Sequence, residues 1–359
     1  PGFSVNFQHF NYGDHELYSG HARLKQADGM IMANSSKNDD DNLVGVAGNL
    51  TFPTTDPRYE NGMGFPTADL GTSTEENTHI SFAHYPFAGG WIAGHVAADG
   101  TLLAGPNVPT GTTITKLDEG QAHVGPGNYV LSIAGVDSST DGMLFVVPGE
   151  NDDNYIGAGV FEDSSNVHVA AGDAALGDWH IHMRDNSQND VSYDGENGAW
   201  SFLYLPYEQQ PDGQIIQNLI GGRVSESGSL VGSVGDFTFD NASTGTYYLR
   251  IPDGQGGYLG GDDGILHLTA SGILEGFDSG NNIDPVEAGA ITWEFNAAED
   301  RFEILAKDAP GSGLDNTAFV FAFVQYDNPL RLAVPEPTSL LLCCLGVSGL
   351  FAGRRRRRR

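Results

Sequence analysis

Two short acidic stretches carry the residue types best suited to metal chemistry in this chain. They read Asn38-Asp39-Asp40-Asp41-Asn42 and Asn151-Asp152-Asp153-Asn154. Oxygen ligands at this density suit Ca²⁺, which binds six to eight oxygens, so the five aspartates are candidate calcium ligands. Neither stretch has the glycine that an EF-hand loop requires at its sixth position. The alternative is that both stretches are solvated turns rich in Asx side chains.

Histidines offer a second metal hypothesis. His180 and His182 share one face of a predicted strand, and the other face carries Trp179, Ile181 and Met183. Two histidines at this spacing could hold Zn²⁺ if His168 joined them from a neighbouring strand. The favoured interpretation is a pair of outward-facing surface histidines.

Aromatic residues recur at alternate positions, and they fit either a sugar-stacking platform or a sandwich core. The candidates are Trp200, Phe202, Tyr204, Tyr207, Phe319, Phe321, Phe323 and Tyr326. Repeated alternation favours core packing. Trp91 and Trp293 have no aromatic counterpart, so we expect them to be the more exposed.

Catalytic motifs are missing from the sequence. It contains no Gly-x-Ser-x-Gly elbow, no His-Glu-x-x-His and no phosphate-binding or dinucleotide fingerprint. Carboxylates are too common for a glycosidase pair to be chosen from sequence. We therefore expect a protein without enzymatic activity or a resident cofactor, calcium being the only candidate. A secreted hydrolase is the least favoured alternative.

An internal repeat organises the elements that would position these residues. One strand-like segment occurs three times, at 80–87, 200–207 and 319–326, with spacings of 120 and 119 residues. A second segment begins at Asp28-Gly29, Asp141-Gly142 and Asp263-Gly264. The repeat predicts three units, 1–89, 90–215 and 216–333. The first lacks the opening strand pair matched at 91–104 and 219–232, so we expect it to be N-terminally incomplete.

Short strands separated by Gly, Asp, Asn and Pro fill each predicted unit. In the second unit they are expected near 90–97, 100–105, 112–117, 127–134, 142–148, 155–162, 166–171, 178–184 and 199–207. No helical periodicity is evident before residue 334. The sequence therefore predicts an all-β fold of tandem antiparallel β-sandwich, jelly-roll-like repeats plus a short C-terminal hydrophobic helix.

The last 26 residues differ from everything before them. Val334-Pro335-Glu336-Pro337 precedes an apolar stretch from Leu340 to Phe351, and the chain ends in Arg354, Arg355, Arg356, Arg357, Arg358 and Arg359. Sixteen residues separate Pro337 from Arg354, about 24 Å as a helix, which is short for a membrane span. The arginines would hold their end in the cytoplasm and leave the preceding chain outside. The alternative is a buried amphipathic helix with a basic end.

This segment, 334–359, resembles the PEP-CTERM sorting signal of exported bacterial proteins in its Pro-Glu-Pro motif, its short hydrophobic stretch and its basic terminus. The resemblance implies cleavage near the motif by an exosortase-type membrane transpeptidase, after transient anchoring in the inner membrane. It also implies delivery to the cell envelope, cell surface or extracellular matrix. A weaker resemblance links the Gly-x-Val-x-x-Asp/Ser-Gly turns and the closing aromatic strands to tumour-necrosis-factor-like jelly rolls. That likeness implies that three units could pack as a pseudo-trimer, and a string of separate units is the alternative.

The negative charge of the chain limits the kinds of partner that it can bind. The chain has 17 Lys and Arg, six of them in the tail, against 47 Asp and Glu. So acidic a surface repels nucleic acid. Both cysteines, Cys343 and Cys344, lie in the tail, so the rest cannot be a disulfide scaffold. We expect an exported structural or adhesive protein. The alternative is a carbohydrate-binding surface module with extracellular polysaccharide as its partner.

Overall fold

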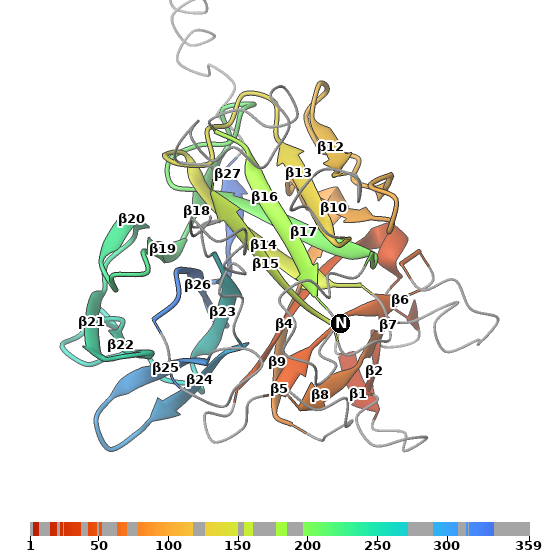
Figure 1. Ribbon diagram of the computed structural model, residues 1–359. Helices are drawn as coiled ribbons and strands as arrows, with labels where there is room; N and C mark the ends of the chain where they lie inside the picture. The colour runs from red at the N-terminus through yellow and green to blue at the C-terminus, as the bar shows by residue number, and fades with distance from the viewer. Residues whose placement is uncertain are drawn as a thin grey trace, which may run out of the picture.

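The chain folds as antiparallel β-sheets (Figure 1). The computed structural model describes residues 3–6, 15–19, 22–23, 25–36, 42–48, 50–51, 63–69, 78–117, 126–149, 154–160, 177–184, 197–271, 290–307, 314 and 316–333. Within these ranges no α-helix occurs, and the two helical turns are the 3₁₀ segments η1 (Gln26–Asp28) and η2 (Phe87–Gly89). The predicted all-β class is confirmed. The predicted C-terminal helix lies outside the described residues.

The strands of 90–215 form a sandwich of the four-stranded sheet β11-β10-β17-β14 and the strands β12-β13-β16-β15, which are one half of an eight-stranded sheet. Their bounds are β10 (Ala93–Val96), β11 (Leu102–Ala104), β12 (Thr113–Lys116), β13 (Asn128–Ser132), β14 (Gly142–Pro148), β15 (Tyr155–Val160), β16 (Trp179–Arg184) and β17 (Trp200–Pro206). The first strand pairs with the last, and β13 pairs with the strand before the last, which is the nested order of a jelly roll.

The strands of 216–333 repeat this order in β20-β19-β26-β23, the other half of the eight-stranded sheet, and in the four-stranded sheet β21-β22-β25-β24. Their bounds are β19 (Ile220–Val224), β20 (Leu230–Val234), β21 (Thr238–Ser243), β22 (Thr246–Arg250), β23 (Gly264–Ala270), β24 (Ala290–Asn296), β25 (Arg301–Lys307) and β26 (Phe319–Gln325). A separate pair, β18 (Ile215–Gln217) and β27 (Arg331–Ala333), lies alongside. One parallel bridge joins β15 to β23.

The strands of 1–89 include one long pair, β4 (Gly29–Ser35) with β9 (Ile80–Pro86). Smaller sheets are built from β1 (Phe3–Asn6), β2 (His15–Ser19), β3 (Ala22–Arg23), β5 (Asn42–Val44), β6 (Ala47–Gly48), β7 (Met63–Phe65) and β8 (Thr67–Asp69). In Figure 1 the red-to-orange strands β1 to β9, the orange-to-green strands β10 to β17 and the green-to-blue strands β19 to β26 form three groups around the centre of the molecule.

One strand pair has the same register in all three groups. We call β4, β14 and β23 the inner strands and β9, β17 and β26 the closing strands. Each inner strand begins with a glycine opposite the end of its closing strand, and the pairs are Gly29–Pro86, Gly142–Pro206 and Gly264–Gln325. A Cβ at these glycines would come within 2.5 to 2.6 Å of a backbone oxygen of the closing strand. Glycine is therefore needed there for the two backbones to approach.

Aromatic side chains fill the interior of each complete sandwich. Trp179, Trp200 and Phe202 lie in the first interior, and Phe302, Phe319 and Phe321 lie in the second. All six are fully buried. The alternation that the sequence shows places these rings on the inner face of each sheet.

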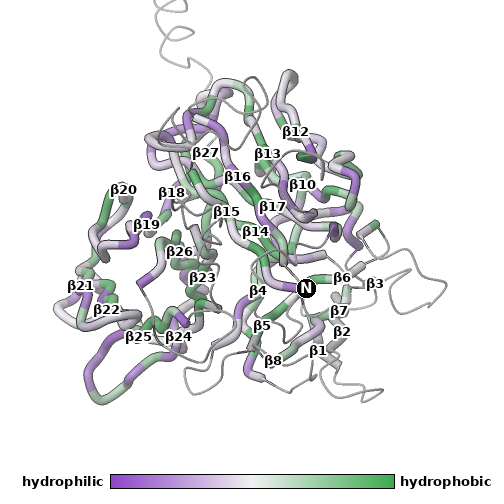
Figure 2. The backbone as a smooth tube through the Cα atoms, in the orientation of Figure 1, coloured by the Kyte–Doolittle hydropathy of each residue, from purple (hydrophilic) through white to green (hydrophobic). Residues whose placement is uncertain are grey.

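A further apolar cluster is shared by all three groups of strands. It includes Met30 and Met32 of β4, Phe145 of β14, Leu203 of β17 and Val320 of β26. Figure 2 shows apolar chain at the centre around β14 and polar chain in the outer turns. The outer faces of the three inner–closing pairs thus form one core, and burial of apolar surface holds them together.

Three junctions surround this core. At the first, β17 and β10 lie against β4; at the second, β26 lies against β14; at the third, β9 lies against β23. Each closing strand therefore contacts the inner strand of another group, and the contacts run once around the centre.

Candidate functional site

The predicted calcium ligands lie outside the described residues. Asp39, Asp40 and Asp41 fall between β4 and β5, and Asp152 and Asp153 fall between β14 and β15. The calcium hypothesis therefore stays a prediction. Calorimetric titration of the chelator-treated protein is expected to show Ca²⁺ binding, and no binding at millimolar concentration would remove it. The sorting motif Val334 to Pro337 and the arginines Arg354 to Arg359 are also outside the described residues.

The histidine pair is buried, which corrects the expectation of surface histidines. His180 and His182 are 3 % and 1 % exposed, with ring centroids 5.8 Å apart. Alternation identifies two faces of a strand but does not reveal that both are covered. No cluster of three metal-ligating side chains occurs within the described ranges, and His168 falls outside them.

Trp91 and Trp293 are also buried, at 6 % and 5 % exposed, so the expectation that they are exposed is wrong. Trp91 packs edge-on against Tyr85 in the shared core, and Trp293 packs against Phe302 inside the last sandwich. The core interpretation of the repeated aromatics holds for Trp200, but Tyr326 is 56 % exposed.

The three inner strands meet at the centre through side chain–backbone hydrogen bonds. Asn34 of β4 donates from Nδ2 to the Leu268 carbonyl (2.8 Å) and accepts at Oδ1 from the Leu268 amide (3.2 Å). Thr269 of β23 accepts at Oγ1 from the Val146 amide (3.2 Å) and donates to the Val146 carbonyl (3.4 Å). Asn34 and Thr269 each stand five residues after the first glycine of their strand. The same position therefore bonds the amide and the carbonyl of a neighbouring inner strand in two of the three groups.

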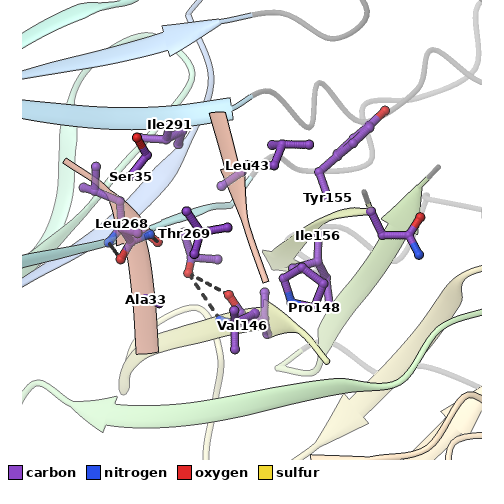
Figure 3. Close-up of a pocket in the computed structure, with 15 residues that line it drawn as sticks. Ala33, Ser35, Leu43, Val146, Pro148, Tyr155, Ile156, Leu268, Thr269 and Ile291 are labelled. Carbon is purple, nitrogen blue, oxygen red and sulfur yellow. Dashed lines mark hydrogen bonds between the residues drawn. The ribbon is translucent and has the colours of Figure 1, made fainter. Parts of the chain in front are cut away.

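A pocket of about 70 Å³ opens where these strands meet (Figure 3). Its lining includes Ala33, Ser35, Val146, Leu268 and Thr269. No carboxylate, histidine, cysteine, lysine or arginine is among its described lining residues. Of the side chains that act in general acid–base catalysis, the described lining contains Tyr155. Asn34 and Thr269 join neighbouring strands here through their hydrogen bonds.

A larger cavity of about 530 Å³ lies beside the second junction. It is lined by Gly135, Val136, Thr140, Asp141, Tyr204, Tyr207, Glu208, Gln209, Gln210 and Pro211. The volume is in the range of ligand pockets, about 300 to 1,000 Å³. Sequence reasoning missed this cavity because its carboxylates and amides belong to common residue types. Only Tyr204 and Tyr207 had been considered for binding.

Two polar atoms of the lining residues are buried and have no hydrogen-bond partner in the described structure. They are the hydroxyl of Tyr207 and Nε2 of Gln210, and Gln210 is only 2 % exposed. Burial raises the pKa of Tyr207 to about 12, so its hydroxyl stays protonated at neutral pH. Tyr204 donates its hydroxyl to the Asp141 carbonyl at 3.1 Å. The lining of the cavity therefore combines aromatic side chains with two carboxylates, those of Asp141 and Glu208.

Residues 333–358 match the family model described as the PEP-CTERM protein-sorting motif. The resemblance of the C-terminal segment to a PEP-CTERM sorting signal is confirmed. The motif indicates an exported protein that is handled at the cell envelope and processed by an exosortase-type enzyme. Neither a curated protein nor a solved structure matches the chain. Over the part of the chain that the structure describes, no helix is both long enough and apolar enough to span a membrane.

Proposed function

We propose that this is a structural or adhesive protein of the cell surface or extracellular matrix, without enzymatic activity, whose three repeats act as one body. The observation that carries the proposal is the apolar core shared by the three groups of strands. A shared core resists separation of the repeats, because pulling them apart would expose buried apolar surface to water. The C-terminal motif supports delivery of this body outside the cell.

Composition supports the same role. Stability cannot come from disulfides, since both cysteines lie at 343 and 344 in the tail. The three groups of strands pack against one another at three junctions, and a body packed in this way keeps its surface in a constant arrangement. A formal net charge of −30 keeps such a body soluble and lets it interact with cationic groups or divalent ions outside the cell.

The test compares producing cells that lack the protein with cells that express the intact chain or a chain ending at Ala333. The intact chain is expected to reach the envelope or matrix and to restore cell–cell or cell–surface cohesion. The shortened chain is expected to lose retention. Normal cohesion in cells without the protein would contradict the structural role, and equal retention of both chains would contradict the sorting step.

A saccharide-binding role is the second candidate, and the cavity at Tyr204 and Tyr207 favours it. Aromatic surface next to amide and carboxylate groups suits a sugar, which presents both C–H faces and hydroxyls. A glycan array of the intact protein is expected to identify an oligosaccharide, and Gln210→Leu is expected to weaken its binding. Gln255→Leu, at an exposed turn, is the matched control. Equal binding by both variants would rule out this cavity.

A further inference from the structure

At the first and second junctions, one side chain donates hydrogen bonds to two backbone carbonyls of the neighbouring group of strands. At the first, His95 of β10 donates from Nε2 to the carbonyl oxygens of Gln26 and Gly29, each at 3.0 Å. At the second, Arg223 of β19 donates to the carbonyl oxygens of Ser138 (3.2 Å) and Ser139 (3.0 Å). Strand β10 and its counterpart β19, the opening strands, thus each hold the turn that precedes a neighbouring inner strand.

The two contacts are equivalent in register. His95 lies opposite Ser201 of its closing strand, and Arg223 lies opposite Val320. Gln26 and Ser139 each stand three residues before the first glycine of an inner strand, Gly29 or Gly142. Both opening strands also carry a bulge at this position, between His95 and Val96 and between Arg223 and Val224.

An aromatic residue after each closing strand is covered at these two junctions. Phe87 is 5 % exposed and its ring lies 5.8 Å from the His95 ring. Tyr207 is half-buried against β20, where a Cβ on Gly232 would lie 2.8 Å from its ring carbons. The opening hairpin of the next group therefore covers the aromatic residue as well as the turn.

The third junction is closed at its centre and open at its outer side. Tyr85 of β9 packs 5.9 Å from His267 of β23. However, Tyr326, which occupies the place of Phe87 and Tyr207, is 56 % exposed. The neighbouring Asp262 and Asp263 are exposed as well.

The outer edge of β9 carries no opening strand in the part of the chain that the structure describes. Closing strands β17 and β26 each pair with an opening strand, β10 or β19. Among the described residues, β9 pairs only with β4. Side chains at the start of β9 are half-buried, whereas those of β17 are fully buried. An edge strand with unpaired backbone groups is a template for another strand.

We propose that the surface formed by Tyr326, the turn Gly260 to Asp263 and the outer edge of β9 binds a β-hairpin of a partner polypeptide. The first hairpin strand pairs antiparallel with β9 and places a hydrogen-bond donor opposite Ser81, the position that corresponds to Ser201 and Val320. That donor binds the Gly261 carbonyl, which is in the place of the Gln26 and Ser139 carbonyls. Asp262 and Asp263 favour a cationic donor, as Arg223 is at the second junction. This is recognition by strand addition, in which backbone pairing supplies affinity and side chains supply specificity.

The probe is a synthetic peptide of residues 219–236, which contains β19, the turn at Gly228 and β20. Both a linear form and a form cyclised through its ends are used, since an isolated hairpin is marginally stable. Saturable binding of the labelled peptide to the full chain is expected by fluorescence anisotropy. Replacing the peptide's Arg223 by alanine is expected to weaken binding about tenfold.

Protein variants locate the site. Tyr326→Arg is expected to weaken peptide binding by at least about tenfold, because the added cation repels the donor and the aromatic surface is lost. Tyr258→Arg is the matched control, since Tyr258 is 45 % exposed in the same repeat. Both variants are expected to keep the thermal transition of the parent. Amides of β9 are expected to exchange more slowly with the peptide bound.

Three results would overturn the proposal. They are the absence of saturable binding up to about 1 mM peptide, equal affinity for the Tyr326→Arg and Tyr258→Arg variants, and unchanged amide exchange along β9. Sedimentation of the chain alone provides a further check. Self-association that Tyr326→Arg abolishes would show that a second copy of this chain takes the surface, and the partner hairpin would then be wrong.

Discussion

The first and third junctions each bury a histidine, but only the histidine at the first has hydrogen-bond partners. His95 is fully buried and uses both ring nitrogens, with Nδ1 accepting from the Ser201 hydroxyl at 2.6 Å and Nε2 donating to two carbonyls. His267 is 1 % exposed, and neither of its ring nitrogens has a partner in the described structure. Equal burial therefore has opposite consequences. His95 joins two repeats, whereas His267 costs stability because its polar atoms lost water without gaining a partner.

The largest effect is expected from His95→Leu. Leucine fits the volume approximately but leaves the Gln26 and Gly29 carbonyls and the Ser201 hydroxyl without their partner. Buried groups left unsatisfied cost about 1 to 3 kcal/mol each, so we expect a loss of about 3 kcal/mol in the free energy of unfolding, measured by urea denaturation. The control is His79→Leu, at an exposed position, which should change stability by less than about 0.5 kcal/mol. Similar losses for the two variants would show that His95 does not join the repeats.

Lowering the pH is expected to reduce the free energy of unfolding through His267. Burial lowers the pKa of His267 to about 3 from its usual 6.5. Below pH 6.5 the unfolded chain binds a proton that the native chain does not, so stability falls as the pH falls towards the native pKa. The slope is about 1.4 kcal/mol per pH unit, which gives about 2 kcal/mol between pH 6.5 and pH 5.

His267→Phe isolates this contribution. Burial also lowers the pKa values of His84 and His95, so the parent loses stability for several reasons in the same pH range. Phenylalanine cannot be protonated and leaves no unpartnered nitrogen. The variant is expected to lose about 2 kcal/mol less than the parent between pH 7.5 and pH 5 in denaturation measurements. An identical pH dependence in both proteins would show that His267 is not titrating as its burial requires.

At the second junction Arg223 donates to two carbonyls of a neighbouring group, as His95 does at the first junction, but its surroundings differ. Arg223 is 8 % exposed, and its carbonyl partners adjoin Thr140, which lines the large cavity. Arg223→Met keeps the apolar stem but removes two hydrogen bonds, and we expect a loss of about 1 to 2 kcal/mol. Arg250→Met is the half-buried control, since Arg250 donates only to the exposed Glu299 carbonyl at 3.3 Å. The loss is expected to be smaller than at His95, because water in the cavity can bind the Ser138 and Ser139 carbonyls once the guanidinium is gone. A loss as large as that of His95→Leu would show that water does not reach these carbonyls.

The strands could be predicted from sequence, but the junctions could not. Alternation and Gly-rich turns predicted strands near 142–148 and 199–207, and β14 and β17 lie there. Those patterns are local and reflect the backbone directly. The bond from His95 to Gln26 spans 69 residues and that from Asn34 to Leu268 spans 234. Such contacts depend on which outer faces pack together, and alternation carries no information on that.

The same limit explains the wrong expectations. Trp91 lacks a counterpart in the other repeats and was therefore expected at the surface, but it fills the shared core, which a single repeat does not have. His180 and His182 occupy the outer face of a strand and are buried all the same. The large cavity was missed because Tyr207 and Gln210 become unusual only through burial without a partner. The sorting motif could be recognised because its Pro-Glu-Pro sequence, apolar stretch and basic end follow one another along the chain.

The smallest effect is expected from Thr269→Val, which breaks the bond between β23 and β14 at the centre. Valine has nearly the same shape as threonine but cannot bind the Val146 amide and carbonyl. The ladder between β14 and β17 is unaffected, so these two hydrogen bonds are lost, one of them long at 3.4 Å, and we expect a loss of about 1 kcal/mol in the free energy of unfolding. Thr238→Val, at an exposed position of β21, is the control and should be close to neutral. If Thr269→Val cost as much as His95→Leu, the hydrogen bonds at the centre would dominate the junctions. The shared apolar core would then be secondary, and the contrast between the two buried histidines would lose its meaning.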